Sequence, residues 1–236
     1  MSQRAARIAV LIPCYNEEVA IKETVTGFRA ALPEATIYVY DNDSKDKTVE
    51  EARAAGAVVR SEPLKGKGNV VRRMFAEIEA DVYVMADGDA TYDASRAPAL
   101  VDRLIGDNLD MVVGKRVHTE PGAYRAGHLL GNRLLSGFLA RLFGRRFTDV
   151  LSGYRVFSRR FVKSFPALSS GFEIETELTV HALALDLPIA EMETRYFSRP
   201  AGSASKLNTF RDGLRILHLM LTLFKTRGRR ALKRLA

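Results

Sequence analysis

Two aspartates separated by one glycine, Asp87-Gly88-Asp89, are the residues of this sequence best suited to hold a divalent cation. They follow the apolar run 81–86, which is typical of a buried strand. Carboxylates are preferred ligands of Mg²⁺ and Mn²⁺, and Mg²⁺ usually completes its shell with water and substrate phosphates. The alternative interpretation of the triplet alone is a solvated Asp-Gly turn.

Two other predicted strands also end in polar residues. The apolar run 8–12 leads into the sequence PCYNEE at 13–18, and the run 36–40 leads into DNDSKDKT at 41–48. Open α/β sheets bind their ligands at the carboxyl ends of their strands. We therefore expect these segments and the aspartate pair to meet at one edge of one sheet.

The pattern of strands and helices predicts an α/β fold with a mainly parallel central sheet flanked by helices. Alternation of strands and helices produces parallel sheets that are covered on both faces. The expected strands lie near 8–13, 36–41, 57–60, 81–87 and 110–114, and the helices near 17–31, 46–55, 67–78 and 95–106. A helix at 125–143, a strand at 153–157, a helix at 172–185, a strand at 189–194 and a basic loop at 195–206 are expected to follow.

Composition limits the classes of function. The net charge of +8 indicates an anionic partner, but no helix-turn-helix, zinc-finger or RNP pattern occurs, so we predict no nucleic-acid partner. The single cysteine, Cys14, excludes an internal disulfide framework and any cysteine-rich zinc site, and its place after an apolar strand predicts a buried thiol. No apolar run of 18 or more residues occurs, so we expect a peripheral protein or a chain cut before its anchor.

The C-terminal segment 207–236 is predicted to be an amphipathic helical extension that binds a membrane surface. Its stretch 214–224 is mostly Leu, Ile, Met and Phe, and six cations without any acid follow between Lys225 and Arg234. An apolar helix followed by basic residues favours an anionic bilayer surface. The expected location is cytoplasmic, at the inner face of the membrane. A core helix with a solvated tail is the alternative.

Three motifs in this order resemble family 2 glycosyltransferases of the GT-A fold. They are IPCYNEE at 12–18, DNDSKDKT at 41–48 and the DGD triplet. Further segments are similar to the branch of that family that glycosylates polyprenyl phosphates, including dolichyl-phosphate mannose synthases. These are KGKGN at 65–69, GKR at 114–116, DVLSGYR at 149–155, GFE at 171–173 and RPAGSASK at 199–206. The resemblance covers about 8–217 and makes 1–206 the expected catalytic domain.

The resemblance implies a nucleotide-sugar site. Asp87 and Asp89 would hold Mg²⁺ or Mn²⁺ against the diphosphate, with Asp89 the more direct ligand and part of the catalytic machinery. Asp41 would accept a hydrogen bond from the base. The remaining expected contacts are Pro13 and Tyr15 with base and ribose, Glu17 with the ribose hydroxyls, and Lys67 near the nucleotide. A helix-start acid and a solvated lysine are the alternatives for Glu17 and Lys67.

The resemblance also implies an acceptor site around Asp149, the candidate catalytic base. A phosphomonoester has a second pKa of about 6 and is already a nucleophile at neutral pH, so Asp149 either deprotonates the acceptor or positions it and its cationic holders. Guanidinium groups match phosphate geometry. The candidate acceptor and phosphate contacts are Arg116, Arg125, Arg133, Ser152, Arg155, Glu173, Arg199, Ser203 and Lys206.

We therefore expect an inverting, metal-dependent glycosyltransferase that moves a hexosyl or N-acetylhexosaminyl group. The donor would be UDP- or GDP-linked and the acceptor a polyprenyl phosphate, and a homo-oligomer is left open. The alternatives are the same donor chemistry on a soluble or polysaccharide acceptor, nucleotidyl transfer, and a basic binding module without enzymatic activity. Nucleotidyl transfer is disfavoured because PCYNEE stands where a Gly-rich loop is expected.

Overall fold

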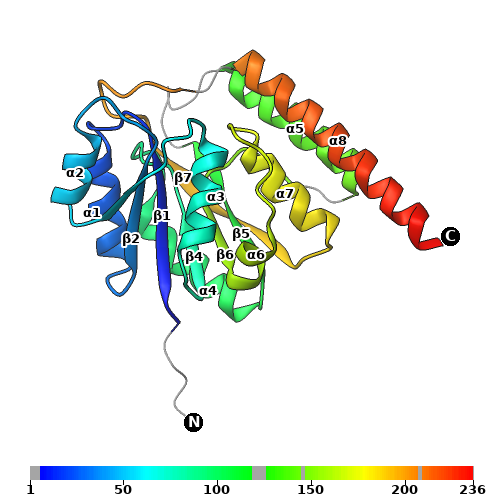
Figure 1. The fold of residues 1–236 in the computed structure, drawn as a ribbon, viewed down its shortest axis with the longest axis horizontal. Helices are drawn as coiled ribbons and strands as arrows, with labels where there is room; N and C mark the ends of the chain where they lie inside the picture. Colours follow the sequence, from blue (N-terminus) through cyan, green and yellow to red (C-terminus); the bar gives the residue numbers. More distant parts are fainter. Residues whose placement is uncertain (1–5, 119–125, 145–146, 207–208, 236) are drawn as a thin grey trace, which may run out of the picture.

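The computed structural model describes residues 6–118, 126–144, 147–206 and 209–235. A seven-stranded sheet forms its centre, in the order β3-β2-β1-β4-β6-β5-β7 (Figure 1). The strands are β1 (Ile8–Cys14), β2 (Thr36–Asp41), β3 (Val58–Ser61), β4 (Val82–Met85), β5 (Met111–His118), β6 (Arg155–Ser158) and β7 (Ile189–Tyr196). All neighbouring strands pair in parallel except β6, which runs antiparallel to β4 and β5. The mainly parallel sheet predicted from the sequence is confirmed.

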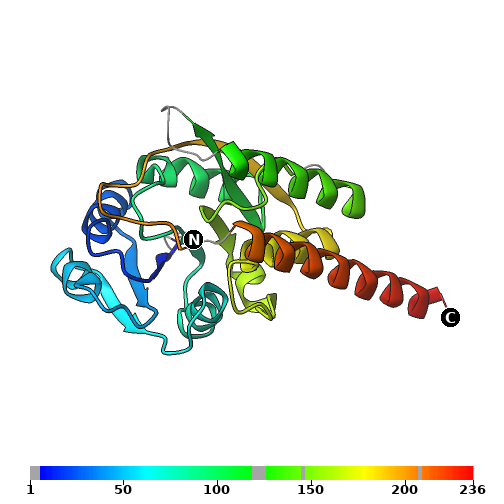
Figure 2. The same cartoon turned by 90° about the horizontal axis from the view of Figure 1, so that it is seen from above.

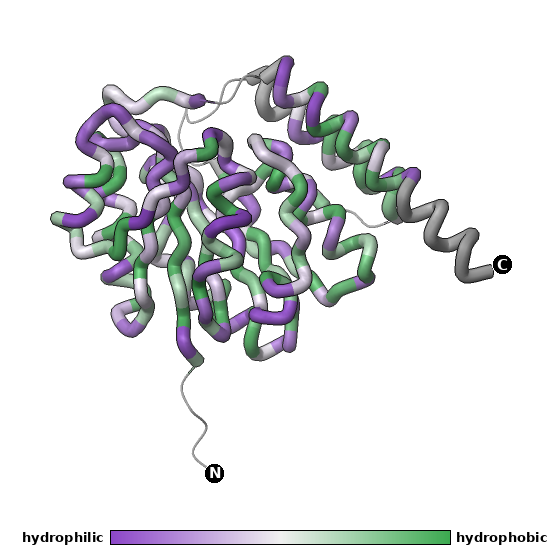
Figure 3. The backbone as a smooth tube through the Cα atoms, in the orientation of Figure 1, coloured by the Kyte–Doolittle hydropathy of each residue, from purple (hydrophilic) through white to green (hydrophobic). Residues whose placement is uncertain are grey.

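Helices cover both faces of the sheet because the strands are apolar on both sides. Along β1, Ala9 and Leu11 pack on one face, whereas Val10 and Ile12 pack on the other, as the two-residue period of a strand requires. The face of Val10 is covered by α1 (Ile21–Ala31), α2 (Thr48–Ala54) and α4 (Ala97–Gly106), with a 3₁₀ turn at Ala94–Arg96. The face of Leu11 is covered by α3 (Lys67–Glu77), α6 (Arg159–Ser164) and α7 (Ile174–Ala184). Figure 3 shows hydrophobic residues running along the central strands.

The first helix begins later than the sequence predicts, at Ile21 instead of residue 17. Asn16 has a positive φ of 52°, which turns the chain after β1. The next two backbone N–H groups donate to side chains of another segment: Glu17 N–H to Thr48 Oγ1 at 2.8 Å and Glu18 N–H to Asp46 Oδ2 at 3.1 Å. Residues 17–20 therefore form a turn that holds Glu17 beside the end of β1.

The C-terminal helix α8 (Thr209–Leu235) packs on the rest of the molecule through α7 and through α5 (Ala126–Phe143). Ile216 and Met220 are buried in the core that the Leu11 face of the sheet shares with α7. The rings of Phe143 and Phe224 meet edge to face, with centroids 5.9 Å apart. Figures 1 and 2 show α8 beside α5, with its C-terminal end extending past the rest of the molecule.

The described part of α8 is amphipathic, as predicted. Leu214, Leu221 and Phe224 are exposed large hydrophobic residues, and Lys225 at its described end is also exposed. The side chains of the predicted basic cluster beyond Lys225 lie outside those that the structure describes. Within the described ranges, no helix is long and apolar enough to cross a bilayer.

Candidate active site

A cleft of about 940 Å³ opens at the carboxyl ends of β1, β2 and β4. It is where the sequence analysis expected the three polar strand ends to meet. Ten of the predicted site residues line it: Pro13, Tyr15, Glu17, Lys67, Asp87, Asp89, Arg116, Arg199, Ser203 and Lys206. The lining continues onto β5, α7 and α8 through Arg116, Glu175 and Arg211.

The DGD triplet is pressed against the end of β1. A side chain at position 88 would overlap the sulfur of Cys14, so only glycine lets the turn approach this closely. Asp89 is 3% exposed, and its Oδ1 accepts hydrogen bonds from the Thr91 N–H at 3.2 Å and the Thr91 hydroxyl at 2.6 Å. Burial, and after it the charge of Asp87, raises the pKa of Asp89. Two carboxylates held this close favour a cation between or beside them.

A segment after β7 crosses the cleft and closes on Glu17. The Glu17 carboxylate accepts from Ser203 Oγ at 2.9 Å, Lys206 Nζ at 2.5 Å and Arg199 at 3.3 Å. The Arg199 guanidinium also pairs with Asp89 at 2.5 Å, and Lys206 donates to the carbonyl of Asn16 at 2.8 Å. Three residues predicted to hold phosphate are thus brought to the carboxylates of the predicted donor site.

Lys67, the first residue of α3, is buried instead of solvated. Its ammonium forms ion pairs with Asp87 and with Glu175 on the first turn of α7. Gly153 allows this approach, because a Cβ there would lie 2.7 Å from Asp87 Oδ2 and 3.1 Å from Lys67 Nζ. Glu175 was not among the site residues predicted from the sequence; its only signal is the acidic series GFEIETE, which is also typical of a helix start.

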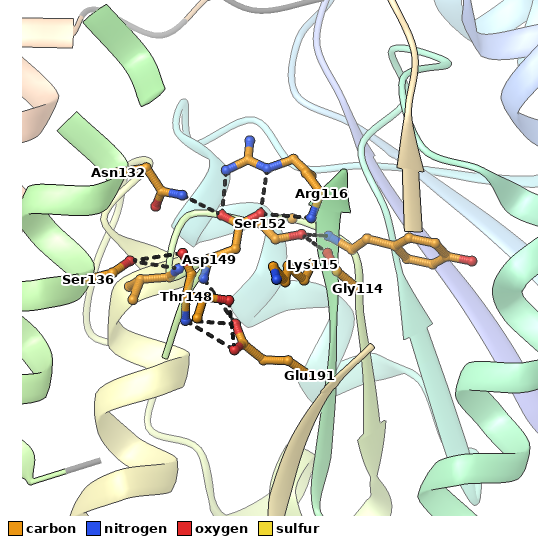
Figure 4. Close-up of polar contacts among 12 residues, drawn as sticks. Gly114, Lys115, Arg116, Asn132, Ser136, Thr148, Asp149, Ser152 and Glu191 are labelled. Atoms are coloured by element: carbon orange, nitrogen blue, oxygen red, sulfur yellow. Dashed lines mark hydrogen bonds and ion pairs between the residues drawn. The ribbon is translucent and has the colours of Figure 1, made fainter. Parts of the chain in front are cut away.

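Asp149 is tied into a hydrogen-bond network with Arg116 (Figure 4). Its carboxylate accepts from Arg116 N–H at 3.1 Å, Nε at 2.8 Å and the terminal guanidinium nitrogen at 2.6 Å, and from Asn132 Nδ2 at 3.0 Å. Burial would raise the pKa of Asp149, but the charge and hydrogen bonds of Arg116 outweigh it and lower that pKa. An ionised carboxylate with these partners is suited to hold Arg116 in place, which favours the positioning role over the base.

The loop before Asp149 is fixed by Glu191 of β7. Its carboxylate accepts from the backbone N–H of Thr148 and of Asp149, each at 3.0 Å, and from the Thr148 hydroxyl at 2.9 Å (Figure 4). Neither Glu191 nor Asn132 was identified from the sequence. A single polar residue on a strand or a helix gives no signal that distinguishes it from a solvated one.

Several predicted acceptor contacts lie away from the cleft lining. Arg155 is fully buried, and its guanidinium donates to the carbonyls of Val150 and Ser152 and to Thr179 Oγ1. Ser152 Oγ donates to the carbonyl of Gly114 at 2.7 Å. Both side chains hold the loop between Asp149 and β6 together, so this geometry corrects their expected contact with an acceptor phosphate.

The remaining predicted site residues do not belong to the cleft lining that the structure describes. Arg133 is exposed on α5, and Arg125 lies outside the described residues. Asp41 is buried, and its carboxylate accepts from the Ser44 N–H at 3.2 Å, while its neighbour Asn42 lines the cleft. Glu173 Oε1 accepts from the Gly171 N–H at 3.2 Å. The role of Asp41 with the nucleobase stays a prediction.

The charges of the cleft suit an anionic ligand together with a cation. Among the described residues that line it, four carboxylates face six cations, and each carboxylate contacts at least one cation of the same chain. Asp87 and Asp89 are the residues that could hold a metal ion. Within the described ranges no cluster of three or more His, Cys, Asp or Glu side chains could do so. An ion here therefore needs further ligands from water or a bound diphosphate, which is how Mg²⁺ is usually held.

Comparison with known proteins agrees with this arrangement. Residues 9–165 match the family model for glycosyl transferase family 2. Glycosyltransferase AglJ of Haloferax volcanii is 36% identical over 87% of this chain and 68% of its own length. The dolichyl-phosphate hexose transferase of the same organism is 29% identical over 89% of this chain and 90% of its own.

The solved structures include one with a metal and a nucleotide. Glucosyl-3-phosphoglycerate synthase from Mycobacterium tuberculosis, in complex with Mn²⁺, UDP and glucosyl-3-phosphoglycerate, superposes with a TM-score of 0.71 at 25% identity. The match covers 94% of this chain and 80% of that one. The GT-A fold and the family resemblance inferred from the sequence are confirmed, and the chain belongs to glycosyl transferase family 2.

Proposed function

We propose that this protein is an inverting glycosyltransferase that moves a sugar from a UDP- or GDP-linked donor to a polyprenyl phosphate. The observation that carries the proposal is a single cleft whose lining combines two sets of side chains. Asp87 and Asp89 belong to the first set, which we take as the donor end, and Arg116 and Arg211 with apolar side chains belong to the second, which we take as the acceptor end. A metal–diphosphate complex suits the first set, and a phosphate attached to an apolar chain suits the second.

The donor end accounts for how the diphosphate leaving group is stabilised. A divalent ion held by Asp87 and Asp89 would neutralise the negative charge that develops on the diphosphate. Arg199 and Lys206 already lie beside Asp89 and Glu17, so the crossing segment can exchange carboxylates for phosphate oxygens when a donor binds. The lysine at position 67 adds a buried cation to the same end.

The acceptor end accounts for how the nucleophile, the acceptor phosphate, is bound. A phosphomonoester is doubly charged at neutral pH and needs cations more than it needs a base. Arg116 lines the cleft with its guanidinium fixed by Asp149 and placed over the ring of Tyr196 at 5.4 Å. Arg211 lies on the first turn of α8, and Leu151, Phe172 and Ile216 add an apolar wall to the cleft. We propose that the acceptor phosphate binds the two arginines and that its chain follows this wall.

Both kinds of relative are compatible with a phosphorylated acceptor. The name of the Haloferax volcanii relative specifies a dolichyl phosphate. The Mycobacterium tuberculosis structure holds glucosyl-3-phosphoglycerate, a small phosphorylated product. A soluble phosphorylated acceptor is therefore the second candidate. The apolar side chains Leu151, Phe172 and Ile216 in the lining of the same cleft favour the lipid.

The deciding experiment is a substrate matrix. UDP- and GDP-sugars are incubated with a short polyprenyl phosphate, the corresponding polyprenol or 3-phosphoglycerate, in Mn²⁺, Mg²⁺ or EDTA. We expect product only with the polyprenyl phosphate and only with a metal. Equal transfer to the neutral polyprenol would contradict the role given to the arginines, and transfer to 3-phosphoglycerate alone would select the second candidate.

We also propose that α8 places the enzyme on an anionic membrane surface at the cytoplasmic face. The exposed Leu214, Leu221 and Phe224 would enter the interface, and each cation of the following segment would add about 1 kcal/mol near anionic headgroups. Co-sedimentation with liposomes should be stronger for the full chain than for a chain ending at Phe224, on anionic vesicles only. Equal sedimentation of the two forms on anionic and neutral vesicles would remove this role from the tail.

A further inference from the structure

Lys67 connects the proposed metal site to a carboxylate on another element. The Lys67 side chain is only 9% exposed, and its ammonium contacts both Asp87 and Glu175. Asp87 follows β4, while Glu175 belongs to the first turn of α7. The Glu175 side chain is 6% exposed and lines the same cleft. One positive charge is therefore shared between two carboxylates, of which only Asp87 is a proposed metal ligand.

The position of Lys67 is fixed from several sides. The Gly68 N–H donates to the carbonyl of Ser170 at 3.0 Å, which holds the start of α3 on the loop before α7. Gly153 packs against both Asp87 and the ammonium. Two carboxylates in contact with the ammonium favour its charged form.

A buried cation and a divalent ion compete for the same carboxylate. The more closely Lys67 pairs with Asp87, the less negative charge remains there for a metal, and the two cations also repel each other. Glu175 draws the same ammonium away from Asp87. Among the described residues, removing the charge of Glu175 leaves Asp87 as the only carboxylate that pairs with Lys67, which strengthens the competition between Lys67 and a metal ion.

We propose that Glu175 is a positioning residue that acts through Lys67 to set the affinity of Asp87 for the divalent ion. The inference rests on the proposed metal site at Asp87 and Asp89 but does not depend on the acceptor. It predicts that Mn²⁺ affinity changes in opposite directions in two variants of one ion-pair cluster, Glu175→Gln and Lys67→Met. If the cluster only joined α3 to α7, both variants would loosen the site and weaken metal binding together.

The test is a titration of the full chain with Mn²⁺ without nucleotide, with free Mn²⁺ followed by electron paramagnetic resonance. Glu175→Gln should weaken Mn²⁺ binding about five- to tenfold, and Lys67→Met should strengthen it by a similar factor. In the Lys67→Met background, Glu175→Gln should have a clearly smaller effect on Mn²⁺ affinity, because Glu175 can no longer act through the lysine. Lys67→Gln, which keeps polar atoms at this site, is measured as well in case the methionine variant does not fold.

Two controls remove charges of the same sign elsewhere. Glu79→Gln removes an exposed carboxylate that pairs with Arg159 and Lys163, and Lys22→Met removes an exposed cation of α1. Neither should change Mn²⁺ affinity. Weaker binding in both the Glu175 and the Lys67 variants, or an unchanged affinity in both, would overturn the inference. A wild-type chain that binds no Mn²⁺, with or without UDP or GDP, would overturn the proposed metal site and this inference with it.

Discussion

Asp89 and Asp149 are buried to the same extent, each 3% exposed, yet their neighbours shift their pKa values in opposite directions. Asp89 lies near a second carboxylate, and burial together with that neighbour raises its pKa. Asp149 accepts three hydrogen bonds from Arg116, and the arginine lowers its pKa. Burial alone therefore does not assign a role to a carboxylate in or beside this cleft; its partners do.

The cleft and the loop beside it therefore contain two different electrostatic arrangements. The proposed donor end keeps more than one carboxylate together and balances them with cations that come from other segments, α3 and the segment after β7. Such pairs can be exchanged for a divalent ion and a diphosphate. At the proposed acceptor end, Asp149 is saturated by hydrogen bonds beside the cleft, so Arg116 would be held ready for an anion instead of being displaced by one.

The largest effect should follow from removing charge at the donor end. Asp89→Asn should lower turnover by about a thousandfold, because loss of metal stabilisation is worth several kcal/mol and each 1.36 kcal/mol is tenfold in rate. Asp87→Asn should be less damaging. Turnover and Mn²⁺-dependent binding of UDP or GDP are measured on the same samples. If nucleotide affinity is the same in EDTA as in Mn²⁺ for the wild-type chain, the donor end does not use a metal.

A smaller effect is expected at the acceptor end. Asp149→Asn keeps the size of the side chain but loses the charge that holds Arg116, and a hydrogen bond to a charged group is worth about 1.5–3 kcal/mol. We expect kcat/KM for the acceptor to fall about ten- to a hundredfold, with KM for the donor unchanged. Because Asp149 acts through Arg116, the double variant with Arg116→Ala should be little worse than Arg116→Ala alone. Fully additive losses would restore an independent role for Asp149, such as that of a base.

The fold was accessible from the sequence because local patterns and the overall topology agree. The strand–helix alternation up to β5 specified a parallel sheet, and the strand ends located the cleft. What the pattern could not show was how the later strands insert. A strand at 155–158 pairs antiparallel with β4 and β5, and nothing in its own residues specifies those partners. Likewise, the apolar stretch of α8 suited a membrane surface and a protein core equally, and only the tertiary fold shows that Ile216 and Met220 are buried in the core.

The candidate site was predictable where a residue's own place in the sequence indicates its chemistry. It was not predictable where the chemistry depends on contact between two residues that are far apart in the sequence. Glu17 and the two aspartates were expected at this cleft, which they line, because they come shortly after strand ends. The contact of Lys67 with Glu175 joins the starts of two helices far apart in the sequence, and only the tertiary fold brings them together. The expected contact of Arg155 with phosphate was wrong for the same reason. An arginine that donates to buried carbonyls cannot be told from one that binds phosphate by its sequence alone.

The smallest effect tests whether α8 belongs to the acceptor end. Arg211 lines the cleft, whereas Arg215, one turn later, is exposed and lies outside the lining. Arg211→Ala should raise KM for a short polyprenyl phosphate about five- to tenfold, since an exposed phosphate contact is worth less than a buried one. KM for the donor should not change, and Arg215→Ala should leave both constants as they are. Because the two variants remove the same charge from the same helix, a general effect on membrane attraction or net charge would shift both equally. Equal behaviour of Arg211→Ala and Arg215→Ala would leave α8 with a role at the membrane surface alone. A rise for Arg211→Ala only would show that the helix completes the acceptor site.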